Sequence, residues 1–353
     1  MTELDKTKPV LVTGATGYVA GWIVKGLLDR GYDVHATVRD PDNSEKLKYL
    51  NAAAENAPGN ISYFKADLLD QGAFSDAMAG CQLVFHTASP FVLSVSDAQK
   101  ELIDPAILGT SNVLTEANNH DSVKRIVLTS SVVSIYGDAI EVHQTPEGMF
   151  NEDQWNTTSS LTHQPYSYSK VQAEKKAWEL AEAANQWDLV VINPGFVLGP
   201  GLSPISNSES FKVIKQMGDG SSKPGLPDLH MATVDVRDLA DAHIKAGLLP
   251  EAKGRHVITG QSASMLEMSQ ILSEKYGRNY SFGSKILPKW LLWLVGPMVN
   301  KAITRKFISL NVGHPLKFDN SKSINQLGMS YRPIKETLEH MFQQMIDFDF
   351  FKK

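Results

Sequence analysis

Short runs of valine, isoleucine and leucine alternate with longer stretches of mixed apolar and charged residues through the first two thirds of the chain. This alternation is typical of parallel strands that are each followed by a helix. It predicts an α/β fold with a doubly wound parallel sheet. The expected strands are Val10 to Thr13, Val34 to Val38, Ile61 to Lys65, Leu83 to Thr87, Arg125 to Thr129 and Leu189 to Asn193.

The stretches between these strands are interpreted as the helices that cover the sheet. Pro105 lies inside the fourth of them, where we expect it to kink the helix or to delay its start. The expected helices are Val19 to Arg30, Asn43 to Ala54, Gly72 to Met78, Ala98 to Asn118 and Tyr166 to Asn185.

Beyond Pro200 the alternation lapses into two segments rich in glycine, proline and serine, which we interpret as loops that contact a substrate. These loops are Gly201 to Asn207 and Gly218 to Asp228. Strands at Val234 to Val236 and His256 to Thr259, with a helix near Asp238 to Leu249, predict a return to the sheet. The expected division is a main domain of residues 8–200 and 232–261, and a smaller C-terminal substrate lobe of residues 201–231 and 262–353.

The most apolar part of the chain is residues 286–299. Its uncharged stretch between Lys289 and Lys301 is 11 residues long and contains a proline. Crossing a bilayer takes about 20 residues, so we expect no membrane span. A packed helix of the smaller lobe is the favoured interpretation. A lid over an apolar substrate and an oligomer contact are the alternatives.

The composition narrows the class of protein. A formal net charge of -5 on 353 residues leaves no broad basic surface for nucleic acid. Cys81 is the only cysteine, so no internal disulfide is possible. Residues 1–8 are polar and lack the apolar core of a secretory signal. We therefore expect a cytoplasmic protein that acts on a small molecule as a monomer or homodimer.

A glycine-rich turn follows the first strand: Thr13-Gly14-Ala15-Thr16-Gly17-Tyr18-Val19-Ala20. Glycines allow a tight turn and a close approach to a diphosphate, and the next helix directs its positive end at that group. Such a turn alone is weak evidence, because strand-to-helix turns also use glycine for structural reasons. The strand before it and the helix after it favour a Rossmann-type dinucleotide site.

The end of the second strand indicates which dinucleotide binds. Val38 stands where an NAD site would place a carboxylate on the ribose, whereas Arg39 and Lys46 can bind a 2′-phosphate. NADP(H) is therefore predicted, although both cations also suit a solvated face and Asp40 can pair with Arg39. Asp67, after the third strand, can accept from the adenine amino group or can cap the next helix.

A tyrosine and a lysine four residues apart open the expected helix after the fifth strand. The spacing of Tyr166 and Lys170 places them on one face, one turn apart, and Ser131 follows the fifth strand. The spacing alone is common, since Tyr331 and Lys335 share it with a proline between them. We expect the Lys170 ammonium to lower the pKa of the Tyr166 phenol, so that Tyr166 protonates a carbonyl oxygen that Ser131 also binds.

Taken together, these motifs resemble the extended short-chain dehydrogenase/reductases, in particular the dihydroflavonol reductase-like NADPH-dependent carbonyl reductases. Further motifs that carry the resemblance are Phe85 to Phe91, Asn193 to Pro200 and Val234 to Asp238. The resemblance implies Ser131, Tyr166 and Lys170 as the catalytic triad. It implies a cofactor path along Gly14, Thr16, Gly17, Tyr18, Val19, Arg39, Lys46, Asp67, Leu68, Thr87, Ala88, Ser89, Tyr166, Lys170, Pro194, Val197 and Ser210, and a substrate pocket of Phe91, Val133, Tyr136 and Met231.

The predicted function is therefore reduction of an aldehyde or ketone by NADPH, with no metal site. His86 is expected to pack or bond locally and not to act in catalysis. An NAD-dependent sugar-nucleotide epimerase or dehydratase would keep the triad but need a carboxylate at Val38. A non-catalytic NADP-binding redox sensor would be free to lose Tyr166 or Lys170, and both are present.

Overall fold

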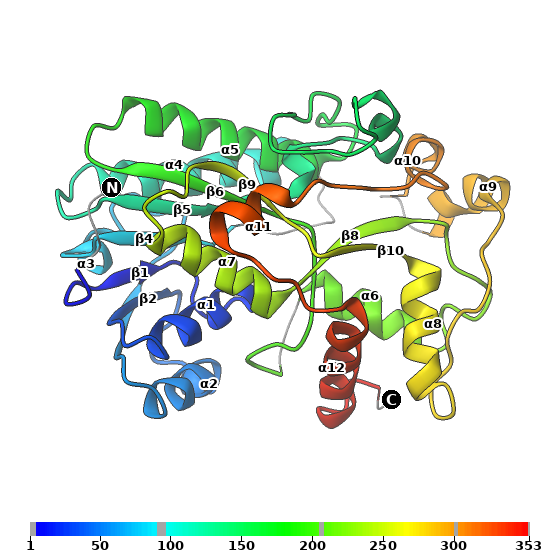
Figure 1. Cartoon of the computed structure of the whole chain (residues 1–353), viewed down its shortest axis with the longest axis horizontal. Coiled ribbons are helices and arrows are strands. Elements are labelled where there is room, and N and C mark those ends of the chain that lie inside the picture. The colour runs from blue at the N-terminus through cyan, green and yellow to red at the C-terminus, as the bar shows by residue number, and fades with distance from the viewer. Residues whose placement is uncertain (1–4, 90–96, 205–207, 300–302, 352–353) are drawn as a thin grey trace.

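The computed structural model describes residues 5–89, 97–204, 208–299 and 303–351 (Figure 1). Its centre is a parallel sheet of seven strands in the order β3-β2-β1-β4-β5-β6-β9. This order is the doubly wound arrangement predicted from the alternation, with the reversal between β1 and β4. The strands are β1 (Val10–Val12), β2 (Val34–Val38), β3 (Ile61–Lys65), β4 (Leu83–His86), β5 (Arg125–Thr129), β6 (Asp188–Pro194) and β9 (Gly254–Ile258).

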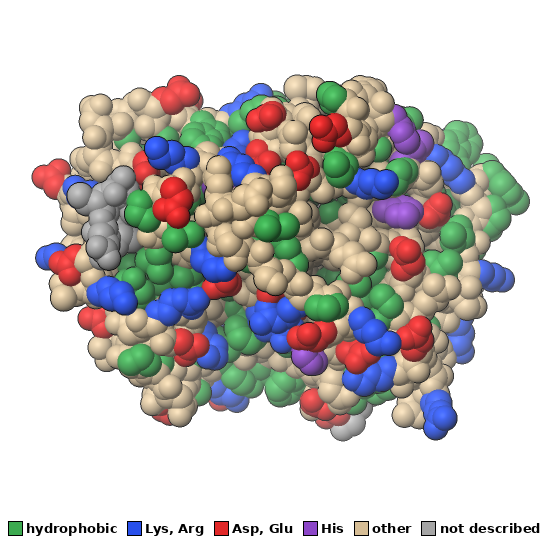
Figure 2. Space-filling view, in the orientation of Figure 1, with side chains coloured by type: hydrophobic (Ala, Val, Ile, Leu, Met, Phe, Trp, Pro, Cys, Tyr) green, Lys and Arg blue, Asp and Glu red, His purple; other side chains and the backbone are tan. Residues whose placement is uncertain are grey.

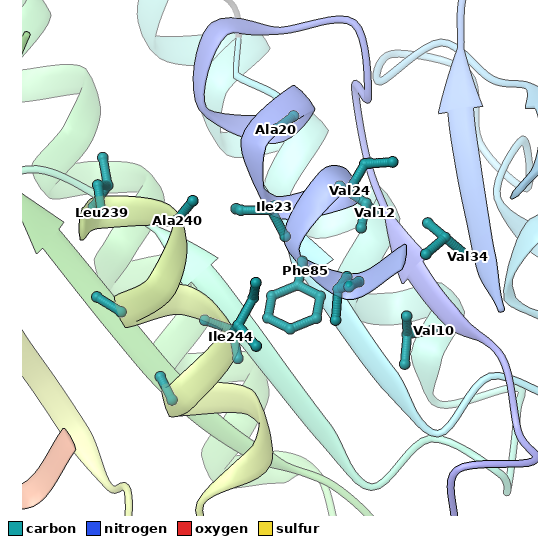
Figure 3. Close-up of a cluster of buried hydrophobic side chains, with 14 of the residues drawn as sticks. Val10, Val12, Ala20, Ile23, Val24, Val34, Phe85, Leu239, Ala240 and Ile244 are labelled. Carbon is teal, nitrogen blue, oxygen red and sulfur yellow. The ribbon is translucent and has the colours of Figure 1, made fainter. Parts of the chain in front are cut away.

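Helices cover both faces of this sheet. One face buries apolar side chains of α1, α2 and α7 around Phe85, and part of this cluster is drawn in Figure 3. The other face buries side chains of α3, α4 and α5. The bounds are α1 (Tyr18–Leu28), α2 (Ser44–Glu55), α3 (Ser75–Met78), α4 (Asp104–Ala117), α5 (Pro165–Ala183) and α7 (Val236–Leu248).

The fourth expected helix starts late, as Pro105 predicted. A π-helical turn, η1 (Gln99–Ile103), precedes α4, and Pro105 occupies the first turn of α4. Proline lacks the amide hydrogen that an interior helix position needs, but the first turn leaves that hydrogen without a partner anyway.

The strand expected at Val234 to Val236 does not return to the main sheet. It is the end of β8 (His230–Asp235), which pairs with β7 (Phe196–Leu198) and β10 (Gln261–Ser264) in a separate three-stranded sheet. Two contacts explain this difference. β9 already occupies the edge beside β6, and a Cβ at Gly195 would lie 2.3 Å from the Ala232 carbonyl oxygen, so only glycine lets β8 cross there.

A third layer packs on this smaller sheet. Side chains of α6 (Glu209–Gly218), α8 (Met265–Tyr276) and α12 (Ile334–Asp347) form one apolar cluster with Leu198 of β7. Phe342 is fully buried at its centre, and its ring packs against the rings of Tyr276, Tyr280 and Phe351. The sequence did not reveal α6, which lies between the two expected loops.

The apolar segment forms α9 (Lys289–Val299), but it is not the packed helix that we expected. Gly296 is the only buried residue of α9, whereas Trp290 is 65% exposed. The two remaining helices are α10 (Arg305–Asn311), against which α9 lies, and α11 (Ser321–Leu327). In the described parts of the chain, no helix has the length and apolar character needed to cross a membrane.

Candidate active site

The glycine-rich turn lies between β1 and α1. Gly14 has φ +66°, and a Cβ at this position would lie 3.0 Å from the Ala88 Cβ, so the turn requires glycine. Gly17 precedes the first residue of α1, and no side chain caps the helix there. Thr16 and Gly17 are exposed. The amide groups of this helix end therefore suit an anionic group such as a diphosphate.

Thr13 joins the ends of β1 and β4. Its hydroxyl oxygen accepts from the amides of Thr87 and Ala88, at 3.1 Å each, and its carbonyl accepts from the Thr87 hydroxyl at 2.6 Å. His86 Nδ1 lies 3.0 Å from the Thr13 hydroxyl. Burial lowers the pKa of His86 to about 3, and the charge of Lys170 acts in the same direction. His86 is therefore neutral, and its contacts are the local ones that the sequence predicted.

Two cations, one directly after β2 and one in the first turn of α2, face solvent. Arg39 and Lys46 are both exposed, and among the described residues no salt bridge joins either of them to a carboxylate. Asp40, the expected competitor for Arg39, instead accepts from the amide of Asp42 at 3.1 Å. Val38 is buried and carries no acceptor. This end of the sheet can bind a phosphate but offers no carboxylate at Val38 for ribose hydroxyls.

Asp67 and Leu68 follow β3 at the same edge of the sheet. The Asp67 carboxylate accepts from the amide of Leu69 at 3.0 Å. This contact caps a turn, which is similar to the helix-capping role that the sequence left open as an alternative. Asp67 is exposed, so its second carboxylate oxygen is accessible to a ligand. Leu68 is half-buried, and its carbonyl accepts from Asn112 of α4 at 2.8 Å.

Tyr166 and Lys170 lie one turn apart in the first part of α5, as the spacing predicted. The ammonium of Lys170 donates to the Ser89 hydroxyl at 3.1 Å and lies 6.0 Å from the centre of the Tyr166 ring. Ser131 comes two residues after β5, where its hydroxyl accepts from the amide of Val133 at 3.3 Å. Three segments distant in sequence thus bring a phenol, an ammonium and hydroxyls to the carboxyl edge of the sheet.

The electrostatics of this pair differ from the expectation. Burial raises the pKa of the Tyr166 phenol above its ordinary value, which is opposite to the direction that we expected from Lys170. Burial also lowers the pKa of Lys170 to about 8, while the Glu174 carboxylate acts in the opposite direction. Both pKa shifts have the same cause. The site excludes water from the two groups, and the loss of water favours the neutral form of each. Lys170 is still protonated at neutral pH.

The remaining predicted cofactor residues lie around this edge. Pro194 ends β6, Val197 lies in β7, and Ser210 is buried in the first turn of α6. The Tyr18 hydroxyl donates to the Gly199 carbonyl at 2.5 Å, so this side chain joins α1 to the turn after β7. Tyr18 and Val19 are the first two residues of α1 and directly follow the glycine-rich turn.

The predicted substrate residues that the structure describes lie in different elements, and two of them belong to different apolar clusters. Val133 lies in η2 (Val132–Ser134), the 3-10 turn directly after Ser131. The Tyr136 ring packs on Phe150, with 5.1 Å between ring centres, and belongs to a different apolar cluster from Met231 of β8. Phe91 lies outside the described residues.

Glu174 was not predicted from the sequence. It is 1% exposed and lies one turn after Lys170. Its carboxylate accepts from the hydroxyls of Ser130 and Ser134 at 2.5 Å each, from Asn193 at 2.9 Å and from Arg255 at 2.6 Å. These partners come from the end of β5, from β6 and from β9. The sequence contains one signal for Glu174. It continues the four-residue spacing of Tyr166 and Lys170, and this spacing places its carboxylate on the same inner face of α5.

Asp138 is a second buried carboxylate near the start of α5. It is bonded to His163 at 2.7 Å, accepts from the side chain of Gln164 at 2.7 Å and from Asn311 of α10 at 2.6 Å. Gln164 immediately precedes α5 and adopts the left-handed conformation, with φ +52°. Asp138 therefore connects α10 with the helix end that carries Tyr166.

Comparisons with known proteins agree with this geometry. The profile of the NAD dependent epimerase/dehydratase family matches residues 10–260. Cinnamoyl-CoA reductase CAD2 of Medicago truncatula is 40% identical over 279 residues, covering 78% of this chain and 83% of that protein. The bifunctional dihydroflavonol 4-reductase/flavanone 4-reductase of Pyrus communis is 32% identical over 360 aligned residues, covering 97% of this chain and 91% of that protein. The crystal structure of Gre2 from Candida albicans in complex with NADPH covers 98% of this chain and all of its own, at 27% identity and a TM-score of 0.79.

The fold and the site define an oxidoreductase with a dinucleotide-binding sheet. The chain belongs to the NAD dependent epimerase/dehydratase family, the extended short-chain dehydrogenase/reductases, as predicted. Its similarity to dihydroflavonol and cinnamoyl-CoA reductases confirms the expected group of relatives and fits a reductase better than an epimerase.

The Glu174 cluster leads to a prediction about stability. Glu174→Gln leaves the buried guanidinium of Arg255 without its anionic partner, so the free energy of unfolding should fall by about 3–5 kcal/mol. The matched control is Glu179→Gln on the same helix, where an exposed pair with Lys176 should change it by less than about 1 kcal/mol. Chemical denaturation measures both variants. Equal losses of unfolding free energy in the two variants would show that the buried cluster contributes no more to stability than the exposed pair.

Proposed function

We propose that this chain is an NADPH-dependent reductase that converts the carbonyl group of an aldehyde or ketone into an alcohol. The observation that carries the proposal is the buried ammonium of Lys170, held by Ser89 at 3.1 Å and close to the Tyr166 ring. Burial of a charged lysine is costly unless its positive charge stabilises a nearby group. A phenol that gives up a proton during turnover is such a group.

The residues present fit a phosphorylated dinucleotide. Only glycine fits at Gly14, the start of α1 has no side-chain cap, and Arg39 and Lys46 are free of salt bridges within the described residues. NADPH bound to these groups would supply hydride to the carbonyl carbon. The NADPH complex of the Gre2 relative supports this choice of cofactor.

Three side chains would carry the proton chemistry. The Ser131 hydroxyl donates a hydrogen bond to the carbonyl oxygen, and the Tyr166 phenol transfers its proton to the same oxygen. Lys170 then stabilises the phenolate that remains, because its charge lies close to the ring. The high pKa of the buried phenol keeps Tyr166 protonated until substrate arrives, as an acid requires.

The same geometry suggests where substrate binds. We propose that residues 201–231 and 262–353 form a substrate lobe together with the rest of β8 (residues 232–235), because β8, β10 and the helices around Phe342 form a layer separate from the main sheet. Val133, Tyr136 and Met231 would line the pocket beside Ser131. The enzyme would act in the cytoplasm as a monomer or homodimer.

An epimerase is disfavoured by the buried, apolar Val38 at the position of a ribose-binding carboxylate. Purified protein incubated with NADPH or NADH and a set of aldehydes, ketones and 1,2-dicarbonyls separates the two functions. A reductase consumes NADPH in proportion to alcohol formed. Turnover of sugar nucleotides without net consumption of cofactor would establish the epimerase instead.

Replacement of the acid tests the role of Tyr166. Tyr166→Phe removes the proton donor and keeps the ring, so kcat should fall by about 10²- to 10⁴-fold while NADPH still binds. The matched control is Tyr168→Phe on the same helix turn, which should leave kcat within about twofold. Steady-state reduction kinetics and NADPH fluorescence titration measure the two effects. Turnover of Tyr166→Phe within a few-fold of the parent would exclude the acid role.

Loss of the phosphate contact tests the cofactor preference. Arg39→Ala should raise the Michaelis constant for NADPH by about ten- to a hundredfold, since charge-assisted hydrogen bonds to phosphate are lost. The constant for NADH should stay nearly unchanged. Lys48→Ala, whose ammonium pairs with Glu45 on α2, is the control cation. An equal loss for both cofactors would count against the contact.

The pKa of Lys170 predicts how the rate depends on pH. The ammonium is lost as pH rises through about 8, whereas the raised pKa of Tyr166 keeps the phenol protonated in this window. Therefore kcat/KM for reduction should be level below pH 8 and should fall by about tenfold per pH unit above it. In Lys170→Arg, whose guanidinium stays charged, the fall should move to higher pH even if the rate is lower. A fall at the same pH in both proteins would assign it to another group.

A further inference from the structure

The helix α9 exposes a large apolar surface at one end of the molecule. Trp290, Leu294 and Met298 follow one another at four-residue spacing, which places them on one face of the helix. They are 65%, 48% and 86% exposed. Figure 2 shows hydrophobic side chains gathered at the right-hand edge of the view, where Figure 1 places α9.

The opposite face of α9 is held firmly on the protein. A Cβ at Gly296 would lie 3.0 Å from Ile308 of α10 and 3.4 Å from Ile303, so the two segments are in close contact there. The Lys289 ammonium donates to the carbonyls of Ser309 and Val312 at the end of α10, at 2.9 and 2.6 Å. The exposed stripe is therefore displayed by an anchored helix.

Charged side chains in the chain segment that contains this stripe are of one sign, although Asp228, from outside this segment, lies beside Gly313 after α10. The sequence contains no aspartate or glutamate between Glu274 and Asp319, although the chain as a whole has a net charge of -5. Arg305 stacks over the Trp293 ring at 4.5 Å, and Lys285 and Lys306 are exposed nearby in sequence. Among the described residues, no salt bridge joins Lys285, Lys289, Arg305 or Lys306 to a carboxylate.

This charge pattern discriminates between possible occupants of the stripe. A second copy of the chain docked through the same face would bring two cationic rims together, which is unfavourable. An anionic surface has the complementary sign. Helices that lie in the interface of a bilayer typically expose tryptophan and leucine on one face and have lysines and arginines beside that face. Tryptophan favours the depth of the lipid headgroups.

We propose that α9 docks this protein peripherally on a bilayer that contains anionic lipid, with Trp290, Leu294 and Met298 inserted among the acyl chains near the headgroups. Lys285, Arg305 and Lys306 contact the lipid phosphates. The helix lies in the plane of the surface and does not cross it. This function goes beyond carbonyl reduction and is independent of it.

Flotation of the full-length protein with vesicles tests the proposal. It should float with an equal mixture of phosphatidylcholine and phosphatidylglycerol and much less with phosphatidylcholine alone. Trp290→Ser with Met298→Ser should weaken binding by at least about tenfold. The matched control is Leu108→Ser with Ile324→Ser, which removes apolar groups of 46% and 43% exposure elsewhere and should leave binding unchanged.

A charge variant tests the second half of the proposal without altering any buried contact. Lys285→Glu with Lys306→Glu should weaken binding by about tenfold or more at low salt and reduce its salt dependence. Lys212→Glu with Lys253→Glu, far from α9 in sequence and also exposed, is the control for net charge. Thermal unfolding checks that each variant remains folded.

Three results would overturn the proposal. The first is failure of the unmodified protein to float with the anionic vesicles. The second is unchanged flotation of Trp290→Ser with Met298→Ser, or of the charge variant. The third is a dimer that forms without lipid, as detected by light scattering, in an unmodified protein that does not float. If Trp290→Ser with Met298→Ser is monomeric under the same conditions, this result would assign the stripe to a second copy of the chain.

Discussion

The buried carboxylate of Glu174 sets the positions of the groups that would carry out catalysis. Its donors come from the end of β5, from β6 and from β9, whereas Glu174 itself belongs to α5. A buried charge without partners is costly, so the three strands and the helix must come together before any of these bonds stabilises the fold. Since Lys170 lies one turn earlier on the same helix face, its distance from the sheet edge is fixed by this cluster.

Much of the main sheet could be predicted because its signals are local. The strands Val34–Val38, Ile61–Lys65 and Arg125–Thr129 have the predicted bounds, since short runs rich in β-branched and aromatic residues, bounded by turn residues, indicate strands even where, as in the edge strand Ile61–Lys65, no side chain is fully buried. The family and the oxidoreductase class were predicted equally well and are confirmed by the comparisons. The glycine-rich turn and the spacing of Tyr166 and Lys170 are short motifs whose meaning depends on the neighbouring strand and helix, which the sequence also contains.

The features that were predicted wrongly depend on contacts distant in the sequence. Whether β8 joins the main sheet depends on β9 at the edge of β6 and on the close approach of Ala232 to Gly195. The exposure of α9 could not be read from an apolar run that equally suits a buried helix. The pKa of Tyr166 follows from how much water the whole site excludes, and the spacing to Lys170 alone gave the opposite direction. The role of Glu174 required its four partners from other elements.

The link through Asp138 has a consequence for how this enzyme can be altered. Asn311 in α10 and Gln164 before α5 share one carboxylate, although 147 positions separate them in the chain (311 minus 164). Asp138 is buried, so loss of either contact would leave a carboxylate oxygen with fewer hydrogen bonds in a site that excludes water, and the two segments are held together for that reason. Redesign of α10 for solubility or immobilisation therefore acts on the chain segment that starts α5, two residues before Tyr166, and with Tyr166 as the proposed acid such a change would alter turnover.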